Sequence, residues 1–443
     1  RARVGYNVDS FGHAGTLPQI LKLSGLDYYV FFRPGSHEKT LPRGPFWWEA
    51  PDGTRVLACR PPLHYGSPGD GTILQRMEAA AADTPEDLSV TMCFYGVGNH
   101  GGGPTRSDID LLVARQQTQE PVQPVFTSPE RYYDEMMALG RDWPVVHDEL
   151  QHHARGCYAA ISQMKAVIRS GEHALLRAER LSALAAVLAQ GDNHQTELQG
   201  AWEKVLFNEF HDILAGTSIR KAYDDVWADF AAASATAAQV EDAALAALQA
   251  REPAPVGEGY AFTVWNPLPW QRTDAIELTV TLSEYQRNRQ ADPGGTRSGG
   301  GPQDSLPVGR PVLRDARGVS IPCQLMQVEF EDDDYQAQVA AQVVMPGLGA
   351  SSFTLDFEGD DPPPQVAGTE LANRIENAYY RVELDPATGY ISSLRDNIEW
   401  HEHLAGPAAV PLVVDDQSDT WSHGIDEFRD EVGRFVACGP AEL

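Results

Sequence analysis

A single aspartate follows the first apolar segment of the chain and could act as a nucleophile or as a metal ligand. Val4–Val8 has the composition of a short strand, and Asp9 comes directly after it, ahead of the turn Ser10–Gly12. In α/β folds the carboxyl ends of strands carry catalytic groups, so Asp9 occupies a position suited to chemistry. The alternative is that Asp9 caps the N-terminus of the following helix, which is the commoner role for such a residue.

A glycine-rich segment offers a second candidate. Phe94–Thr105 contains five glycines, which allow positive φ angles and a close approach of the backbone to a ligand. The segment lacks the Gly-Lys-Ser/Thr ending of a phosphate-binding loop and the glycine spacing of a dinucleotide fingerprint. His100 in this loop could serve as an acid, a base or a ligand. The alternative is a tight turn that leads into a helix after Pro104.

A histidine and an aspartate stand next to each other in an apolar segment. His211 and Asp212 interrupt Phe207–Ser218, which the pattern predicts to be a helix that ends at Gly216. Burial of two polar side chains costs free energy unless they find partners, and a metal ion would be one such partner. Taken alone, His211 is more often a core histidine whose hydrogen bonds are satisfied.

Two further groups are less specific. The segment His147–Cys157 holds three histidines, but their spacing is not that of a zinc-binding HExxH helix. A polar loop that faces a substrate, or a structural junction, is the favoured interpretation. Phe46–Trp48 and Trp421 offer flat faces on which sugars stack, but such residues are equally ordinary core material.

Three compositional zones must position these side chains. Residues 1–150 alternate short apolar runs with turns and short helices, which predicts an α/β domain, and they include a hairpin signal at Pro51–Gly53 and a strand candidate at Val90–Gly96. Residues 151–252 carry apolar side chains at three- and four-residue spacing, which predicts a three-helix bundle. Residues 253–443 contain short alternating segments between turns, which predicts a β-sandwich domain.

The composition excludes several classes of protein. The chain has 443 residues, 42% of them hydrophobic, with a net charge of −29, so nucleic acid and anionic membrane surfaces are improbable partners. No apolar stretch is long enough for a transmembrane helix. The five cysteines lack CxxC spacing, which indicates neither a disulfide framework nor a thiolate zinc site and fits reducing surroundings.

Together these segments resemble glycoside hydrolase family 38, the class II α-mannosidases, in their bacterial form. Six segments carry the resemblance in order along the chain: Asn7–His13, Phe46–Gly53, Tyr95–Thr105, His152–Tyr158, Leu206–Ser218 and Asp419–Gly424. The resemblance implies a partial α/β barrel-like domain, a three-helix bundle and the start of a β-sandwich domain of mutarotase type. It also implies a zinc-dependent retaining α-mannosidase that acts on mannose-containing glycans.

The resemblance further implies roles for individual residues. Asp9 matches the catalytic nucleophile, which is also a zinc ligand, and His211 matches a second zinc ligand. Arg33 matches an arginine that positions the sugar, and Asp212 and Tyr65 are expected to bind substrate with it. A retaining enzyme needs a second acid group about 5–5.5 Å from the nucleophile.

The sequence departs from the family pattern in two places. The remaining zinc ligands of the family lie in a His-x-Asp segment upstream of the nucleophile, so we expect two further ligands before Arg1 and a chain that is an internal, inactive piece of the enzyme. Many relatives carry Asp where this loop has Asn99, and an amide side chain cannot act as a general acid in the way that a carboxyl group does. The general acid is therefore open, with His100 as the choice and Asp70 as another candidate.

Two alternatives to the mannosidase remain: a catalytically degenerate carbohydrate-binding homologue, and a zinc glycosidase that prefers another sugar. A cytoplasmic location and a possible homo-oligomer complete the expectations.

Overall fold

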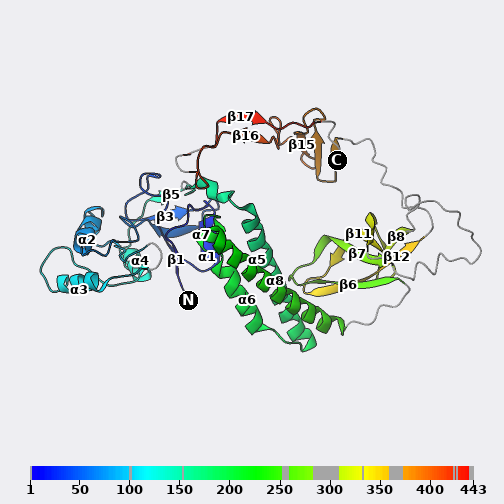
Figure 1. The fold of residues 1–443 in the computed structure, drawn as a ribbon, viewed down its shortest axis with the longest axis horizontal. Coiled ribbons are helices and arrows are strands. Elements are labelled where there is room, and N and C mark those ends of the chain that lie inside the picture. Colours follow the sequence, from blue (N-terminus) through cyan, green and yellow to red (C-terminus); the bar gives the residue numbers. More distant parts are fainter. Residues whose placement is uncertain are drawn as a thin grey trace, which may run out of the picture. The chain divides into compact units, whose positions relative to one another are not determined.

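The computed structural model describes residues 2–98, 102–151, 154–251, 259–282, 309–331, 334–358, 373–422, 425 and 428–438. These residues form a mixed α/β structure with several separate sheets (Figure 1). The chain divides into two compact units. The first consists of Arg1–Lys165, Glu209–Ala222 and Asp416–Phe428, and the second of Ala166–Asn208, Tyr223–Asp415 and Arg429–Leu443. Each unit therefore joins stretches that are distant in sequence.

The first unit contains a five-stranded sheet with the order β1-β2-β4-β3-β5. Its strands are β1 (Val4–Asn7), β2 (Tyr28–Phe31), β3 (Pro45–Glu49), β4 (Arg55–Cys59) and β5 (Val145–Val146). Strands β1, β2 and β4 are parallel neighbours, whereas β3 pairs antiparallel with β4. The predicted hairpin is thereby confirmed, and Gly53 adopts φ +84° in its turn.

Both faces of this sheet are buried, because successive side chains of a strand point to opposite sides. On one face Tyr28 and Val30 pack with Tyr133 of α4 (Pro129–Ala138). On the other face Tyr29 and Phe31 pack in a cluster that includes a leucine of α1 (Leu17–Leu23). Burial on both sides explains why these strands read as continuous apolar runs.

The strand predicted at Val90–Gly96 is wrong. The segment has no strand pairing, and backbone groups of Phe94 and Gly96 have other partners. Arg76, on α2 (Ile73–Ala82), donates from Nε to the carbonyl of Phe94, and Ser67 exchanges hydrogen bonds with both backbone groups of Gly96. Further along the chain, α3 (Arg106–Arg115) begins after Thr105, whose hydroxyl caps its N-terminus.

Three long helices follow, and they pack together within the second unit (Figure 1). They are α5 (Ser162–Ala189), α6 (Gln195–Phe207) and α8 (Arg220–Gln249), preceded by the short 3-10 helix η1 (Arg155–Tyr158). Arg177 of α5 pairs with Glu241 of α8, and Lys204 of α6 pairs with Asp229 of α8.

The helix predicted through His211 is divided in two. Helix α6 ends at Phe207, and a separate short helix, α7 (His211–Leu214), begins at His211. The buried Asn208 explains the break, since its side-chain amide donates to the carbonyl of Lys204 in the last turn of α6 and to Asp229. The ladder of helical hydrogen bonds therefore stops one turn before the histidine.

The rest of the second unit is built from antiparallel strands. One sheet has the order β10-β11-β7 and another the order β6-β12-β8-β9, and the two share one hydrophobic core. Smaller sheets are β13-β14-β15 and β16-β17. The strands are β6 (Tyr260–Asn266), β7 (Arg272–Leu282), β8 (Arg310–Asp315), β9 (Ser320–Ile321), β10 (Cys323–Glu331), β11 (Asp334–Met345), β12 (Gly349–Glu358), β13 (Arg374–Glu376), β14 (Tyr380–Leu384), β15 (Ile391–Asp396), β16 (Leu412–Val414) and β17 (Glu431–Arg434).

The domain boundaries expected at residues 150 and 252 stay predictions, as do the barrel-like, bundle and mutarotase-type descriptions. Within the part of the chain that the structure describes, none of the helices combines the length and the apolar character needed to cross a membrane.

Candidate active site

Asp9 lies just beyond the carboxyl end of β1 and is the centre of the candidate site. Its side chain is 22% exposed, so a ligand can reach it although it is half-buried. Helix α1 begins only at Leu17, its N-cap is Thr16, and no side chain caps it. The capping role considered for Asp9 is therefore wrong, and the carboxylate is available for other partners.

Arg33 meets Asp9 from the neighbouring strand. Because β1 and β2 are parallel, their carboxyl ends lie at the same edge of the sheet, and Arg33 follows β2 as Asp9 follows β1. Arg33 Nε donates to Asp9 Oδ1 over 2.6 Å. A charge-assisted hydrogen bond of this kind stabilises the ionised carboxylate and fixes one of its oxygens.

His211 reaches the other carboxylate oxygen from a remote part of the sequence. Its Nε2 lies 3.4 Å from Asp9 Oδ2 and 3.8 Å from Asp212 Oδ2. The imidazole is 31% exposed, so it is no core histidine. All three residues belong to the first compact unit, because α7 is part of it. The tertiary structure thus unites the first and third sequence candidates.

Tyr65 completes the surroundings of Asp9. Burial raises the pKa of Asp9, but hydrogen bonds from His211, Arg33 and Tyr65 outweigh it and bring the pKa well below its usual range. Burial and the same bond to Asp9 raise the pKa of Tyr65 to about 12, so its hydroxyl keeps its proton and donates. Asp9 is therefore an ionised carboxylate held by three donors.

Two histidines near Asp9, His211 and His64, have pKa values shifted in opposite directions. The hydrogen bond to Asp9 raises the pKa of His211 against the effect of burial, and Asp212 adds to it. Burial lowers the pKa of His64, and the nearby Arg33 lowers it further. The His64 ring lies against the Tyr65 ring at a tilt of 32°, with centroids 4.0 Å apart, which places a neutral imidazole close to the site.

Aromatic rings line the approach to His211. The Phe11 ring lies 6.2 Å from His211, edge-on, and 4.6 Å from the ring of Trp421. Sequence reasoning named Trp421 without placing it and missed Phe11 and His64. Phe11 stands two residues after Asp9 and His64 directly before Tyr65, so proximity to the candidates was the available signal. Nothing in the sequence indicated that Trp421 would come near Phe11.

Two glycines allow the segments of the site to meet. Gly12 has φ +144°, and a Cβ there would lie 2.8 Å from the carbonyl oxygen of Leu150. Gly216, with φ +80°, ends the segment after α7, and a Cβ there would lie 2.6 Å from the carbonyl oxygen of Ala160. Side chains at these positions would separate the loop that carries Asp9 and the short helix that carries His211 from the segments that support them.

Other predicted residues do not join the cluster. His100 and Asn99 lie outside the described residues, as do His152 and His153. Asp70 accepts hydrogen bonds from the backbone and the hydroxyl of Thr72 at the start of α2. The Thr72 hydroxyl contributes most to lowering the pKa of Asp70, which favours the ionised form and argues against an acid role.

The donor atoms at the site are those of a zinc ligand set, one carboxylate and one imidazole. Two donors held about 2.0–2.2 Å from a tetrahedral ion lie about 3.4 Å apart, and Asp9 Oδ2 and His211 Nε2 are 3.4 Å apart. Asp9 and His211 therefore fit part of such a site. Among the described residues, no group of three or more His, Cys, Asp or Glu side chains is arranged to hold a metal ion.

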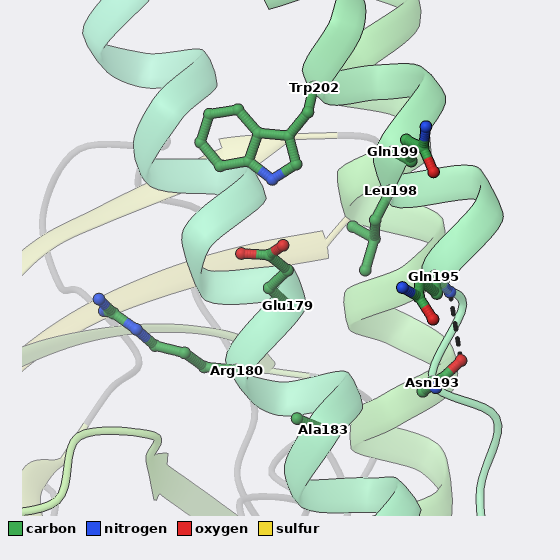
Figure 2. Close-up of a pocket in the computed structure, with 8 residues that line it drawn as sticks. All are labelled: Glu179, Arg180, Ala183, Asn193, Gln195, Leu198, Gln199 and Trp202. Atoms are coloured by element: carbon green, nitrogen blue, oxygen red, sulfur yellow. Dashed lines mark hydrogen bonds between the residues drawn. The ribbon is translucent and has the colours of Figure 1, made fainter. Parts of the chain in front are cut away.

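A pocket of about 600 Å³ lies elsewhere, between α5 and α6 (Figure 2). Trp202 covers one end of it, above Glu179, and Leu198 lines its middle. Its lining includes none of the residues around Asp9, and it holds no histidine or cysteine. The chemistry available at Asp9 is therefore not available there.

Comparison with protein families gives two adjacent matches. The model of the glycosyl hydrolases family 38 N-terminal domain matches residues 1–149, and the model of the alpha mannosidase middle domain matches residues 152–248. The first contains Asp9 and Arg33, and the second contains His211. The residues that meet at Asp9 thus come from both matched regions.

Curated relatives and solved structures agree with these matches. The chain is 30% identical over 283 residues to alpha-mannosidase 2C1 of Mus musculus, covering 61% of this chain and 26% of that protein. It is 28% identical over 240 residues to an alpha-mannosidase of Saccharomyces cerevisiae, covering 50% and 22%. The crystal structure of an alpha-mannosidase from Enterococcus faecalis V583 matches with a TM-score of 0.63 at 19% identity, over 90% of this chain and 48% of that one. The matched part spans about a quarter of the length of the curated relatives.

Proposed function

Because the chain belongs to glycosyl hydrolase family 38, we propose that the protein containing it hydrolyses terminal α-mannosides of glycans or oligosaccharides. The observation that carries the proposal is the convergence of Arg33 and His211 on the two oxygens of Asp9. The names of the curated relatives support mannose as the sugar. We further propose that configuration at the anomeric carbon is retained.

Asp9 is the proposed nucleophile. Its low pKa keeps the carboxylate ionised at neutral pH, which is the form that attacks. One carboxylate oxygen forms a bond to the anomeric carbon while the bond to the leaving oxygen breaks and an acid protonates that oxygen. Water then cleaves the glycosyl ester, returns the carboxylate and gives the sugar with its original configuration.

Arg33, Tyr65 and Asp212 are proposed to bind the sugar around this nucleophile. Arg33 and Tyr65 already hydrogen-bond Asp9, so a sugar hydroxyl beside the carboxylate would meet both donors. Asp212 offers an acceptor close to His211, where a hydroxyl can donate. For the general acid we retain His100, in the loop next to Asn99.

Zinc is the proposed cofactor, with Asp9 and His211 among its ligands. Bound zinc would act as a Lewis acid that orients sugar hydroxyls and favours the distorted ring of the transition state. A catalytic zinc site takes about three protein ligands, so at least one more is needed beyond these two. Asp9 Oδ1 would keep its hydrogen bond to Arg33, and Oδ2, which faces His211, would be the oxygen that binds zinc.

The five cysteines are free, which fits reducing surroundings and supports the cytoplasm as the proposed location.

Turnover of an aryl α-mannoside by the protein that contains this chain tests the nucleophile. Asp9→Asn keeps the shape but removes the negative charge, so we expect kcat to fall on the order of 10⁴-fold. Asp9→Gly leaves space for a small anion, and added azide should restore turnover and give the glycosyl azide of inverted configuration. Full activity of Asp9→Asn would exclude the proposed role.

One observation favours a second function. Asn99 stands where a protonated carboxyl would be expected, so a degenerate homologue that binds mannosides without hydrolysis is the alternative. Calorimetric titration with a mannoside, combined with a panel of aryl glycosides, separates the cases. Binding without turnover would support the alternative, and turnover of another sugar in preference to mannose would change the substrate class.

A further inference from the structure

His13 is a buried histidine that lies beside the candidate active site without facing its ligand space. It is 3% exposed and stands four residues after Asp9 in the loop between β1 and α1. The rings of Tyr29 and Phe31 surround it edge-on, each with a centroid distance of 5.4 Å. A polar ring inside an aromatic core costs free energy unless both nitrogens have partners.

Both nitrogens of His13 have partners, and together these fix one tautomer. Nε2 lies 2.9 Å from the backbone carbonyl oxygen of Arg33, and Nδ1 lies 2.9 Å from the hydroxyl of Tyr29. A carbonyl oxygen can only accept, so Nε2 carries the proton and Nδ1 accepts from Tyr29. Burial lowers the pKa of His13 to about 4, which keeps the imidazole neutral.

The backbone of His13 is held as firmly as its ring. Its N–H donates to the carbonyl of Leu150, and its carbonyl accepts from the N–H of Leu150. Arg33 is consequently fixed at two points, at its carbonyl by His13 and at its Nε by Asp9. Asp9, His13 and Arg33 form a closed ring of covalent and hydrogen-bonded connections.

We propose that His13 is a positioning residue, which holds the backbone of Arg33 so that the guanidinium meets Asp9. The sequence needs such a device because Arg33 lies beyond the last paired residue of β2, where the sheet no longer fixes the chain. The kinetic consequence of this proposal rests on the proposed function, whereas the structural consequence does not.

The test compares His13→Leu with two matched variants of the full chain. His13→Leu fills the space but removes both hydrogen bonds. His13→Gln restores a donor that can reach the Arg33 carbonyl. Phe31→Leu disturbs the same aromatic core without touching a polar contact, so it controls for lost packing.

The direct readout is the Arg33 Nε–H signal in protein labelled with ¹⁵N-arginine, assigned by its absence in Arg33→Lys. We expect a shifted, slowly exchanging signal in the unmodified chain, in His13→Gln and in Phe31→Leu. In His13→Leu it should move to the position of solvent-exposed arginines. An unchanged signal in His13→Leu would overturn the proposal.

The kinetic readout uses an aryl α-mannoside and the protein that contains the chain. A misplaced Arg33 should lower kcat/KM of His13→Leu about a hundredfold, mainly through kcat, with most of the loss recovered in His13→Gln. An equal loss in Phe31→Leu would mean that packing alone is responsible and would also overturn the proposal. If the arginine signal behaves as expected but even the unmodified protein shows no turnover, the positioning role stands and the proposed function fails.

Should His13→Leu fail to fold, Tyr29→Phe replaces it, because that change removes only the hydroxyl that donates to His13 Nδ1. Faster exchange of the Arg33 Nε–H is then expected, because the His13 ring loses one of its two supports, while ¹⁵N-histidine spectra should still show the tautomer with the proton on Nε2. An unchanged arginine signal would contradict the proposal.

Discussion

The two oxygens of the Asp9 carboxylate have different neighbours, and this asymmetry is the main chemical property of the site. Arg33 holds Oδ1 at 2.6 Å, whereas Oδ2 faces His211 at 3.4 Å. A nucleophile must be ionised, and Arg33 serves this need at Oδ1. Oδ2, on the histidine side, is the oxygen that the proposed zinc ion would share with His211.

Also at the scale of single residues, the buried His13 predicts how the stability of the chain depends on pH. Burial lowers its pKa from 6.5 to about 4 in the folded state, so the unfolded chain binds the proton more readily. The contribution of the neutral His13 ring to the free energy of unfolding is complete above pH 6.5 and is lost as the pH falls towards 4. At pH 5 we expect the free energy of unfolding to be about 2 kcal/mol lower than at pH 7.5 from this residue.

Urea denaturation of the unmodified chain and of His13→Gln at both pH values provides the measurement. The gap in stability between the two proteins should narrow at pH 5. A gap that stays constant would show that His13 is not the group responsible.

At the scale of elements, the loops after β1 and β2 carry Asp9 and Arg33, and the short helix α7 carries His211. At Gly12 the loop after β1 approaches the segment that follows β5 closely. Gly12→Ala would combine a strained φ of +144° with a contact of 2.8 Å to backbone atoms, so we expect a loss of about 3 kcal/mol. Gly53→Ala is the control, because φ there is +84° but no atom lies within 4 Å, and a loss of about 1 kcal/mol is expected.

Denaturant titration of both variants would measure this difference. Equal losses would mean that φ alone, and not the close approach to residues 150 and 151, decides the cost.

The packing of α5 on α8 gives a second prediction at the scale of elements. A Cβ at Gly171 of α5 would lie 3.0 Å from the buried ring of Phe230 on α8, so the ring would have to move. Gly200 of α6 has nothing within 4 Å. Alanine is favoured over glycine inside a helix, and we expect Gly200→Ala to stabilise the chain by about 0.5–1 kcal/mol.

Gly171→Ala should give no such increase in stability, or should lower the stability of the chain. The melting temperatures of the two variants test the contrast. A similar rise in both would show that α5 and α8 are less closely packed than the distance indicates.

Across the whole molecule, the candidate site depends on segments about two hundred residues apart. Asp9 and His211 come from regions that match two different family models, and both belong to the first compact unit. A zinc site that includes them can form only when α7 returns to the sheet. The proposed zinc binding would therefore depend on both matched regions and not on either one alone.

We accordingly expect the protein that contains this chain to hold about one zinc ion and to lose activity reversibly with a chelator. His211→Ala should weaken zinc binding by more than the about 10- to 100-fold typical of outer-shell changes. The control is His194→Ala, at the start of α6 in the other unit. Elemental analysis and competition with a chromophoric chelator give the affinities, and unchanged zinc binding by His211→Ala would exclude it as a ligand.

Local sequence patterns determined most of the elements. The hairpin predicted around Pro51–Gly53 forms because these turn residues and the flanking apolar runs favour the same structure. Six short segments in order along the chain, from Asn7–His13 to Asp419–Gly424, were together sufficient to identify the family. These features depend on neighbours within a few residues, which the sequence lists directly.

The tertiary structure decided which candidates meet. His211 could have been a core histidine, and that interpretation fails because α7 lies against the end of β1. Asp9 could have been a helix cap, and that interpretation fails because α1 begins only at Leu17. The predicted strand at Val90–Gly96 is absent, and Arg76 and Ser67 hydrogen-bond to the backbone of Phe94 and Gly96 instead. The role of His13 depends on a carbonyl twenty residues away and a hydroxyl on the next strand. Contacts of this kind are set by the packing of the whole unit, and no local pattern encodes them.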